Sequence, residues 1–444
     1  MDRRNLLKGF GLFGLSTVLP FAGGGGILDS LNNPTDKPVK QENETPGLVF
    51  FNKLDNEFEF LNTLGYAHYR FADIGELLAI RALINEDDAE TGVQAYLKFA
   101  QTCEATADTC ITKGHIQSAR DGYFRACTYY FSATSFLDST PDPGRFTDIW
   151  KKHRECWTKG AKLMDLDYEE FEIPYEGKTL PGFFFKRKGD ITPRPLFIMN
   201  NGSDGPIIAS WTWGGSAALE RGYNVLTFDG PGQGASLFLN KIYFRYDWEK
   251  VITPVIDSVI NRKDVDKDKI VLYGLSQGGY WAPRAAAFES RIKVMIADPG
   301  VVDVSTSWLD HLPKELVGLL RSGNKEEFNK YMSAGNASPE QQAALSFRSR
   351  PYGIDDQFEL FTSAMKYNIT PVADKIKCHT IITDPENEQF WPGQAQNLYD
   401  MINAPKDIIR FTAAEGANYH CEPKAKLLWE QRVFDRLDEI IKKL

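Results

Sequence analysis

The sequence predicts an α/β protein: a mostly parallel sheet with helices on both faces, preceded by a helical N-terminal domain and interrupted by a helical insertion. After about residue 166, short apolar runs alternate with helix-length segments, which is typical of a parallel sheet covered on both faces. Between about residues 50 and 165, apolar residues recur at spacings of three and four, which indicates packed amphipathic helices.

The first 27 residues carry a pattern of their own. Arg3 and Arg4 precede an apolar, glycine-bearing stretch that runs to Pro20. That stretch, about 12 apolar residues, is too short to cross roughly 30 Å of hydrocarbon. The pattern resembles a bacterial twin-arginine signal, so we expect export of a folded, active protein to the bacterial periplasm. Residues 28–49 are rich in Asn, Pro, Lys and Glu and predict a flexible leader.

Residues 50–165 predict the helical N-terminal domain, which would act as a cap. Helical spacing of apolar residues is clearest over 74–83, 93–100 and 123–133. A Pro-Asp-Pro-Gly segment at 141–144 breaks the pattern, which then resumes over 146–163. This part of the chain therefore predicts a bundle of several helices.

Residues 166–298 and 371–444 predict the sheet domain. Two β-type runs joined by a turn at Glu176-Gly177 come first, and six short apolar runs follow. The expected strands are 171–175, 180–185, 196–200, 223–228, 269–273, 293–297, 379–383 and 407–412. The chain ends in an amphipathic helix at about 424–443. Residues 299–370, which are polar and helical in pattern, predict a cap insertion between two strands of the sheet.

The composition excludes several classes of function. The chain has 51 Lys and Arg against 60 Asp and Glu, a net charge of −9, and no basic block, so nucleic acid is not an expected partner. The six cysteines form no C-x-x-C pair, so neither a zinc finger nor a dense disulfide framework is indicated. No motif implies a metal or another cofactor. No other stretch approaches the roughly 18 apolar residues of a membrane span, so we expect no stable membrane insertion after export. A small-molecule substrate is expected, and a homodimer stays open.

The strongest motif is Gly274-Leu275-Ser276-Gln277-Gly278. It follows the buried run at 269–273 and precedes a helix-length segment, which is the strand-turn-helix setting that the G-x-S-x-G motif requires. Such a turn strains the backbone of the middle residue and exposes its hydroxyl, while the glycines avoid collisions with neighbouring strands. We therefore predict that Ser276 is a nucleophile.

A serine nucleophile needs a base and a carboxylate that orients the base. Of the six histidines, His420 lies in the loop between the last expected strand and the last helix, where it would reach the edge of the sheet that carries Ser276. The carboxylate should follow the strand at 379–383. Asp384, Glu386 and Glu388 compete for this role in the loop 384–392.

A tetrahedral intermediate also needs two amide donors, normally the residue after the nucleophile and one from the loop after the third strand. Gln277 is the first candidate. In the loop 200–205, Ser203 is the preferred second donor, with Asp204 as its neighbour. The glycine-rich segment 229–236 is not followed by G-K-[ST], so we interpret it as a tight turn beside the pocket.

These motifs resemble the α/β-hydrolase superfamily. The segments 173–183, 228–234, 390–395 and 411–423 are similar to the group of dihydroxypseudooxynicotine hydrolase and the fungal polyketide-shortening pigment hydrolases. The resemblance covers roughly residues 122–444 and implies an α/β-hydrolase fold with a helical domain ahead of the sheet. Superfamily members place their acid two or three residues before an apolar-Pro step, which favours Glu388 and leaves Asp384 as the alternative. Related sequences commonly carry Asp at this position.

The sequence therefore predicts a serine hydrolase with Ser276, His420 and Glu388. The resemblance implies an ester, or a C–C bond next to a ketone, in an aromatic or polyketide-like small molecule. Two other functions stay open: an aminopeptidase or acylaminoacyl-peptidase, and a non-catalytic binding module on a hydrolase fold. The complete Ser, acid and His set argues against the binding module. Six aromatic residues are candidates for lining the pocket or for the core: Tyr129, Tyr130, Phe131, Trp211, Trp213 and Trp308.

Overall fold

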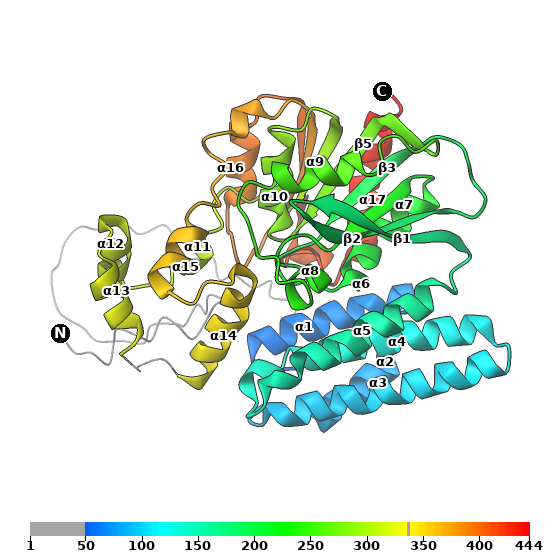
Figure 1. Cartoon of the computed structure of the whole chain (residues 1–444), viewed down its shortest axis with the longest axis horizontal. Helices are drawn as coiled ribbons and strands as arrows, with labels where there is room; N and C mark the ends of the chain where they lie inside the picture. The colour runs from blue at the N-terminus through cyan, green and yellow to red at the C-terminus, as the bar shows by residue number, and fades with distance from the viewer. Residues whose placement is uncertain (1–48, 335–337) are drawn as a thin grey trace, which may run out of the picture.

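The computed structural model describes residues 49–334 and 338–444 and is built around one eight-stranded sheet (Figure 1). The strand order is β1-β2-β4-β3-β5-β6-β7-β8, in which the β1/β2 and β2/β4 pairs are antiparallel and all other pairs are parallel. The predicted signal at 1–27 and nearly all of the predicted leader at 28–49 lie outside the described residues.

All eight expected strands are present. Their bounds are β1 Leu166–Tyr175, β2 Lys178–Arg187, β3 Arg194–Asn200, β4 Asn224–Phe228, β5 Val265–Leu275, β6 Ile292–Asp298, β7 His379–Pro385 and β8 Lys406–Phe411. The predicted turn between β1 and β2 consists of Glu176 and Gly177, at φ 44° and 76°. Left-handed conformations at both positions match the right-handed twist of the flanking strands, as in a two-residue type I′ hairpin.

Alternate residues of the central strands face two separate cores. In β3, Leu196 and Ile198 pack into one hydrophobic cluster, and Phe197 and Met199 pack into the other. The first cluster holds the helices on one face of the sheet, and the second holds those on the other face. The helices of the sheet domain are α6 Ile207–Ser210, α7 Ser216–Glu220, α8 Gly234–Phe238, α9 Glu249–Asp257, α10 Gly278–Ala286, α16 Gln394–Met401 and α17 Lys426–Ile441.

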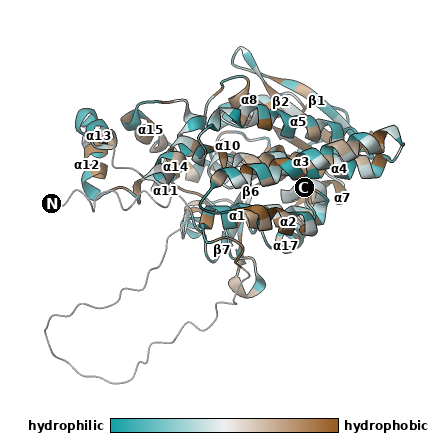
Figure 2. Cartoon of the chain, turned by 90° about the horizontal axis from the view of Figure 1, so that it is seen from below, coloured by the Kyte–Doolittle hydropathy of each residue, from teal (hydrophilic) through white to brown (hydrophobic). Residues whose placement is uncertain are grey.

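Five helices precede the sheet and form the group coloured blue to cyan in Figure 1. They are α1 Leu54–Gly65, α2 Ile74–Leu83, α3 Ala89–Thr112, α4 Ile116–Thr134 and α5 Phe146–Ala161. Hydrophilic and hydrophobic residues both occur along these helices, as in amphipathic helices (Figure 2). Their buried residues join the cluster that contains Phe197 and α17, so the bundle packs against one face of the sheet.

A second helical group interrupts the sheet between β6 and β7. Its helices are α11 Thr306–Leu309, α12 Lys314–Ser322, α13 Lys325–Met332, α14 Pro339–Ser349 and α15 Gln357–Ala364, drawn in yellow in Figure 1. Their buried residues belong to the cluster that contains Leu196 and α10. The predicted fold class is therefore confirmed: a mostly parallel sheet with helices on both faces and a helical N-terminal region. Among the helices of the described residues, none is long and apolar enough to span a membrane.

Candidate active site

Ser276 occupies the sharp turn between β5 and α10. Its φ is 57°, in the left-handed region that a serine rarely adopts. Its amide donates a hydrogen bond to the carbonyl oxygen of Asp298 over 2.6 Å, which ties the turn to the end of β6. Glycines near Ser276 leave no room for a side chain. A Cβ on Gly274 would lie 2.1 Å from the Gly278 oxygen, and a Cβ on Gly279 would lie 1.8 Å from the Pro299 oxygen.

The structure brings the predicted base next to this serine. His420 lies in the loop between β8 and α17, and its Nε2 is 2.8 Å from Ser276 Oγ. Its Nδ1 lies 2.9 Å and 2.8 Å from the two carboxylate oxygens of Glu388. The side chains of His420 and Glu388 are only 4% and 5% exposed, so this ion pair is shielded from water. The arrangement is a continuous chain of hydrogen bonds from hydroxyl to imidazole to carboxylate.

Backbone amides hold the Glu388 carboxylate in place. Its Oε1 accepts hydrogen bonds from the amides of Phe390 and Trp391 over 2.9 Å and 3.2 Å. Asp384, the alternative acid, lies at the end of β7 and pairs with Arg410 over 3.4 Å. Burial raises the pKa of Asp384, and Arg410 opposes that shift. Of these two carboxylates, Glu388 is the one that contacts the imidazole.

The loop after β3 lies against the nucleophile. A Cβ on Gly202 would come within 2.8 Å of Ser276 Cβ. The next residue, Ser203, lines a pocket together with Gln277. Within the described part of the chain, neither the Ser203 amide nor the Gln277 amide has a hydrogen-bond partner. Two unpaired N–H groups beside the serine hydroxyl have the chemistry that stabilises an oxyanion.

Gln233 supports this loop, and its role was not predicted from the sequence. Its Nε2 donates to the carbonyl oxygens of Asn201 and Gly202 over 2.9 Å and 2.7 Å, and its Oε1 accepts from the Gly230 amide. The glycine-rich segment 229–236 is thus a turn that also holds the loop 200–205 after β3. The glutamine inside that segment was the available signal, because a long amide side chain in a tight turn can bond to neighbouring backbone groups.

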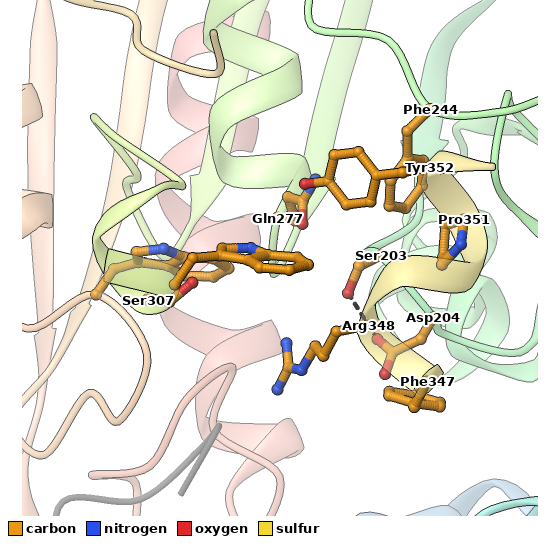
Figure 3. Close-up of a pocket in the computed structure, with 11 residues that line it drawn as sticks. Ser203, Asp204, Phe244, Gln277, Ser307, Phe347, Arg348, Pro351 and Tyr352 are labelled. Carbon is orange, nitrogen blue, oxygen red and sulfur yellow. Dashed lines mark hydrogen bonds between the residues drawn. The ribbon is translucent and has the colours of Figure 1, made fainter. Parts of the chain in front are cut away.

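The pocket beside Ser203 and Gln277 combines aromatic and charged side chains (Figure 3). Its other lining residues come from several loops and from the insertion. They are Asp204, Phe244, Ser307, Trp308, Phe347, Arg348, Pro351, Tyr352 and Trp391. Of the six aromatic candidates, only Trp308 lines this pocket. Tyr129 and Tyr130 are buried within the N-terminal bundle, and Trp213 stacks edge-on against Tyr66. The insertion therefore supplies much of the pocket wall.

Helix α1 of the N-terminal bundle also reaches the site. The Phe58 ring centroid lies 6.3 Å from that of His420 and 6.0 Å from that of Phe390. The guanidinium of Arg348 in α14 also packs on Phe390, with its Cζ 5.3 Å from the ring centroid. Helices from before the sheet and from the insertion therefore meet beside the histidine. Periodicity predicts the helices but not this meeting point, because docking of whole helices depends on long-range packing.

Two buried carboxyl groups lie behind the histidine loop. Asp298 accepts hydrogen bonds from Tyr273 Oη over 2.7 Å and Thr383 Oγ1 over 2.6 Å. Glu422 is fully buried, and burial followed by the Asp298 charge raises the pKa of Glu422 well above its usual value. Burial also raises the pKa of Asp298.

Comparison with known proteins identifies the class of the chain. The model of the alpha/beta hydrolase family matches residues 197–421. Hydrolase LUC6 from Fusarium sp. is 32% identical over 412 residues, covering 88% of this chain and 96% of that protein. The 20-hydroxy-prefusarin hydrolase FUS2 of Gibberella moniliformis is 30% identical over 349 residues, covering 75% and 81%. The crystal structure of 2,6-dihydroxy-pseudo-oxynicotine hydrolase shares the fold, with a TM-score of 0.66, 20% identity, and coverage of 85% and 95%.

The relatives correct two linked predictions. They are fungal proteins, so the predictions of a bacterial twin-arginine signal and of a periplasmic location are wrong. The pattern consists of two arginines and a short apolar stretch, which is too little sequence to specify that export route. The predicted fold and class of enzyme are confirmed by the same comparisons. The chain belongs to the α/β-hydrolase family and is a hydrolase.

Proposed function

We propose that this hydrolase uses Ser276 as a nucleophile, His420 as general base and Glu388 as the orienting acid. The observation that carries the proposal is the unbroken set of contacts from Ser276 Oγ through both ring nitrogens of His420 to Glu388, each 2.8 to 2.9 Å long. It occurs at a strained turn with φ 57°, which is the backbone conformation expected for an exposed nucleophile.

The reaction then proceeds in two steps. Ser276 Oγ attacks the substrate carbonyl while His420 Nε2 accepts the hydroxyl proton, and the developing oxyanion receives hydrogen bonds from the amides of Gln277 and Ser203. The imidazolium, stabilised by Glu388, gives its proton to the leaving group as the bond breaks. Water attacks the acyl-enzyme by the same route and releases Ser276.

We further propose a small aromatic or polyketide-like substrate, cleaved at an ester or at a C–C bond next to a ketone. For an ester the leaving group is an alcohol. For the C–C bond it is the enolate of the ketone, which takes the same proton. The aromatic lining of the pocket supports an unsaturated or ring-bearing substrate. The name of the FUS2 relative, 20-hydroxy-prefusarin hydrolase, supports a secondary-metabolite substrate.

A turnover screen tests the reaction class. Wild type, Ser276→Ala and Ser307→Ala are assayed with aryl esters, aromatic β-diketones and aminoacyl anilides. Ser307 lines the same pocket and donates its hydroxyl to the Val304 carbonyl, so it is a matched control. We expect turnover of esters or diketones, lost in Ser276→Ala and retained in Ser307→Ala. Preference for the anilides would replace the proposed substrate class by a peptidase, and full activity of Ser276→Ala would contradict the mechanism.

A further inference from the structure

Two buried polar atoms in the pocket beside Ser276 have no hydrogen-bond partner. Within residues 49–334 and 338–444, the side-chain nitrogen Nε2 of Gln277 and the hydroxyl oxygen of Tyr352 are both buried and unpaired. Each residue is only 5% exposed, and both line the pocket. A buried donor without a partner costs free energy, so nearly all such groups in folded proteins are paired. Two of them in the wall of one pocket indicate a ligand that pairs with them.

The hydroxyl of Tyr352 is held in place by the packing of its ring. The ring packs edge-on against Phe244 at a centroid distance of 5.3 Å and against Trp308 at 5.5 Å. The backbone just before it is also tied, because the Phe244 amide donates to the Pro351 carbonyl oxygen over 2.8 Å. Figure 3 shows the hydroxyl end of Tyr352 directed across the pocket, toward the side that Gln277 lines. The hydroxyl therefore has a fixed direction into the pocket.

Gln277 is placed by the turn that carries Ser276. Its carbonyl oxygen accepts hydrogen bonds from the amides of Tyr280 and Trp281 over 3.0 Å and 3.3 Å, which fixes the residue at the start of α10. Its own amide is one of the two proposed oxyanion donors, and the same residue lines the pocket. The oxyanion donor and the side-chain donor are therefore separated by no more than one glutamine side chain. A substrate held by both donors presents two oxygens that lie a few bonds apart.

A 1,3-diketone has this arrangement of oxygens. Three carbon atoms join its two carbonyl oxygens, so one oxygen can become the oxyanion while the other lies in the leaving group. Burial raises the pKa of the Tyr352 phenol, so the phenol stays protonated and donates a hydrogen bond. The glutamine amide is a second donor, and one carbonyl oxygen has lone pairs for both. The alcohol that leaves a simple ester carries no such second oxygen.

We propose that the side chains of Tyr352 and Gln277 form a leaving-group subsite, which binds the second carbonyl oxygen of a 1,3-diketone and favours cleavage of its C–C bond. The proposal rests on the function proposed above and selects one of its two bond types. Ser276 Oγ bonds to the first carbonyl carbon while His420 takes the proton. The bond to the central carbon then breaks, and its electron pair moves onto that carbon and the second oxygen, forming an enolate. The proton from His420 goes to the central carbon, and a ketone leaves.

The two donors act on the charge that develops in the leaving group. A hydrogen bond to an ionised oxygen is roughly twice as strong as one to a neutral oxygen. Both contacts therefore stabilise the transition state for C–C cleavage more than they stabilise the bound diketone. Their loss should slow the acylation step more than it weakens binding, and it should do so for the diketone rather than for an ester with the same acyl group.

Two substrates with one acyl group test the proposal. Dibenzoylmethane and phenyl benzoate both form the benzoyl ester of Ser276, but only the diketone leaves as an enolate. In single-turnover measurements of leaving-group release, we expect the ratio of diketone rate to ester rate to fall about 10- to 50-fold in Tyr352→Phe and in Gln277→Met. Tyr367→Phe is the control and should keep the wild-type ratio. The Tyr367 ring packs 5.7 Å from that of Tyr352, and Tyr367 lies outside the residues that line the pocket.

Binding to a variant that cannot react provides a second readout. Trp308 and Trp391 line the pocket, so their fluorescence should report on the bound diketone. In Ser276→Ala, the Kd of dibenzoylmethane should rise about 2- to 10-fold when Tyr352→Phe is added, the size of one neutral hydrogen bond. The subsite is overturned if the variants slow both substrates equally, or if the added Tyr352→Phe leaves the Kd unchanged.

Fluorophosphonate labelling separates this proposal from the catalytic one. Labelled Ser276 in a wild-type protein that cleaves phenyl benzoate but not the diketone would refute the subsite alone. Ester hydrolysis that persists in Ser276→Ala, together with no labelling of the wild type, would refute the catalytic proposal. The Kd comparison would still test the subsite in that case, because it requires no reaction at residue 276.

Discussion

The choice of triad acid is decided at the scale of single side chains. Glu388 and Asp384 both follow β7, but Glu388 is turned toward His420 and receives two backbone amides, whereas Asp384 faces Arg410. The sequence left three carboxylates open in this loop, and only a resemblance to other hydrolases ranked them. The direction of each side chain depends on how the loop closes on the histidine loop, which no local pattern encodes.

Substitution of the two acids measures this difference. Glu388→Gln should lower kcat by about 100-fold or more with the fold intact, because the imidazolium loses its counter-charge. Asp384→Asn should change kcat by a few-fold at most. Both variants are compared by steady-state kinetics on the best ester or diketone. The reverse ranking would reassign the acid to Asp384.

Gln233 holds the loop 200–205, which carries the proposed oxyanion donor Ser203. Gln233→Ala should lower kcat by about 10-fold with little change in KM, because the Gly202 and Asn201 carbonyls lose their donors and the Ser203 amide is less well placed. Gln396→Ala removes a surface glutamine that bonds to Asp400 and serves as the control. If kcat of Gln233→Ala is unchanged, or falls only as much as kcat of Gln396→Ala, the proposed role of Gln233 is contradicted.

At the scale of elements, the sheet was predictable and the docking of the helices was not. All eight strands carry short apolar runs, since both faces of the sheet are buried, and the G-x-S-x-G motif marks the junction between β5 and α10. Helix α1 lies within the predicted helical domain 50–165, yet the contact of Phe58 with His420 joins residues far apart in the chain. Periodicity identifies a buried face but not its partner. The buried pair Asp298 and Glu422 was missed for the same reason.

The β5–α10 junction is sensitive to added volume. Gly279→Ala should lower the free energy of unfolding by about 2–4 kcal/mol, because its Cβ would lie 1.8 Å from the Pro299 oxygen. Gly318→Ala in α12 meets nothing within 4 Å and should stabilise the helix by about 0.5–1 kcal/mol. Urea unfolding of both variants measures the effects. Equal stability of the two would mean that the junction is not tightly packed.

At the scale of the whole molecule, two helical groups from opposite sides of the sheet meet over one site. The bundle of α1–α5 contributes Phe58, and the insertion contributes Trp308 and Arg348. Neither group carries the proposed reacting residues Ser276, His420 and Glu388, which come from the loops of the sheet.

The buried Asp298–Glu422 pair should make the stability of the whole chain depend on pH. The pKa of Glu422 is raised in the folded state, so Glu422 binds its proton more tightly in the folded protein than in the unfolded chain. The resulting contribution to the free energy of unfolding is complete below the pKa of the unfolded chain, near 4.5, and is lost as the pH rises. Glu422→Gln cannot ionise. Its stability relative to wild type should therefore increase between pH 5 and 8, by at most about 1.4 kcal/mol per pH unit. A difference that does not change with pH, measured by urea unfolding, would contradict this.

The most direct test of the central claim, that Ser276 is the nucleophile activated by His420, is peptide mass mapping after reaction with a fluorophosphonate. We expect one adduct per chain, on the peptide that contains Ser276, formed at least 100-fold more slowly in His420→Ala. An adduct on a different residue, or no adduct on the folded wild-type protein, would contradict the claim.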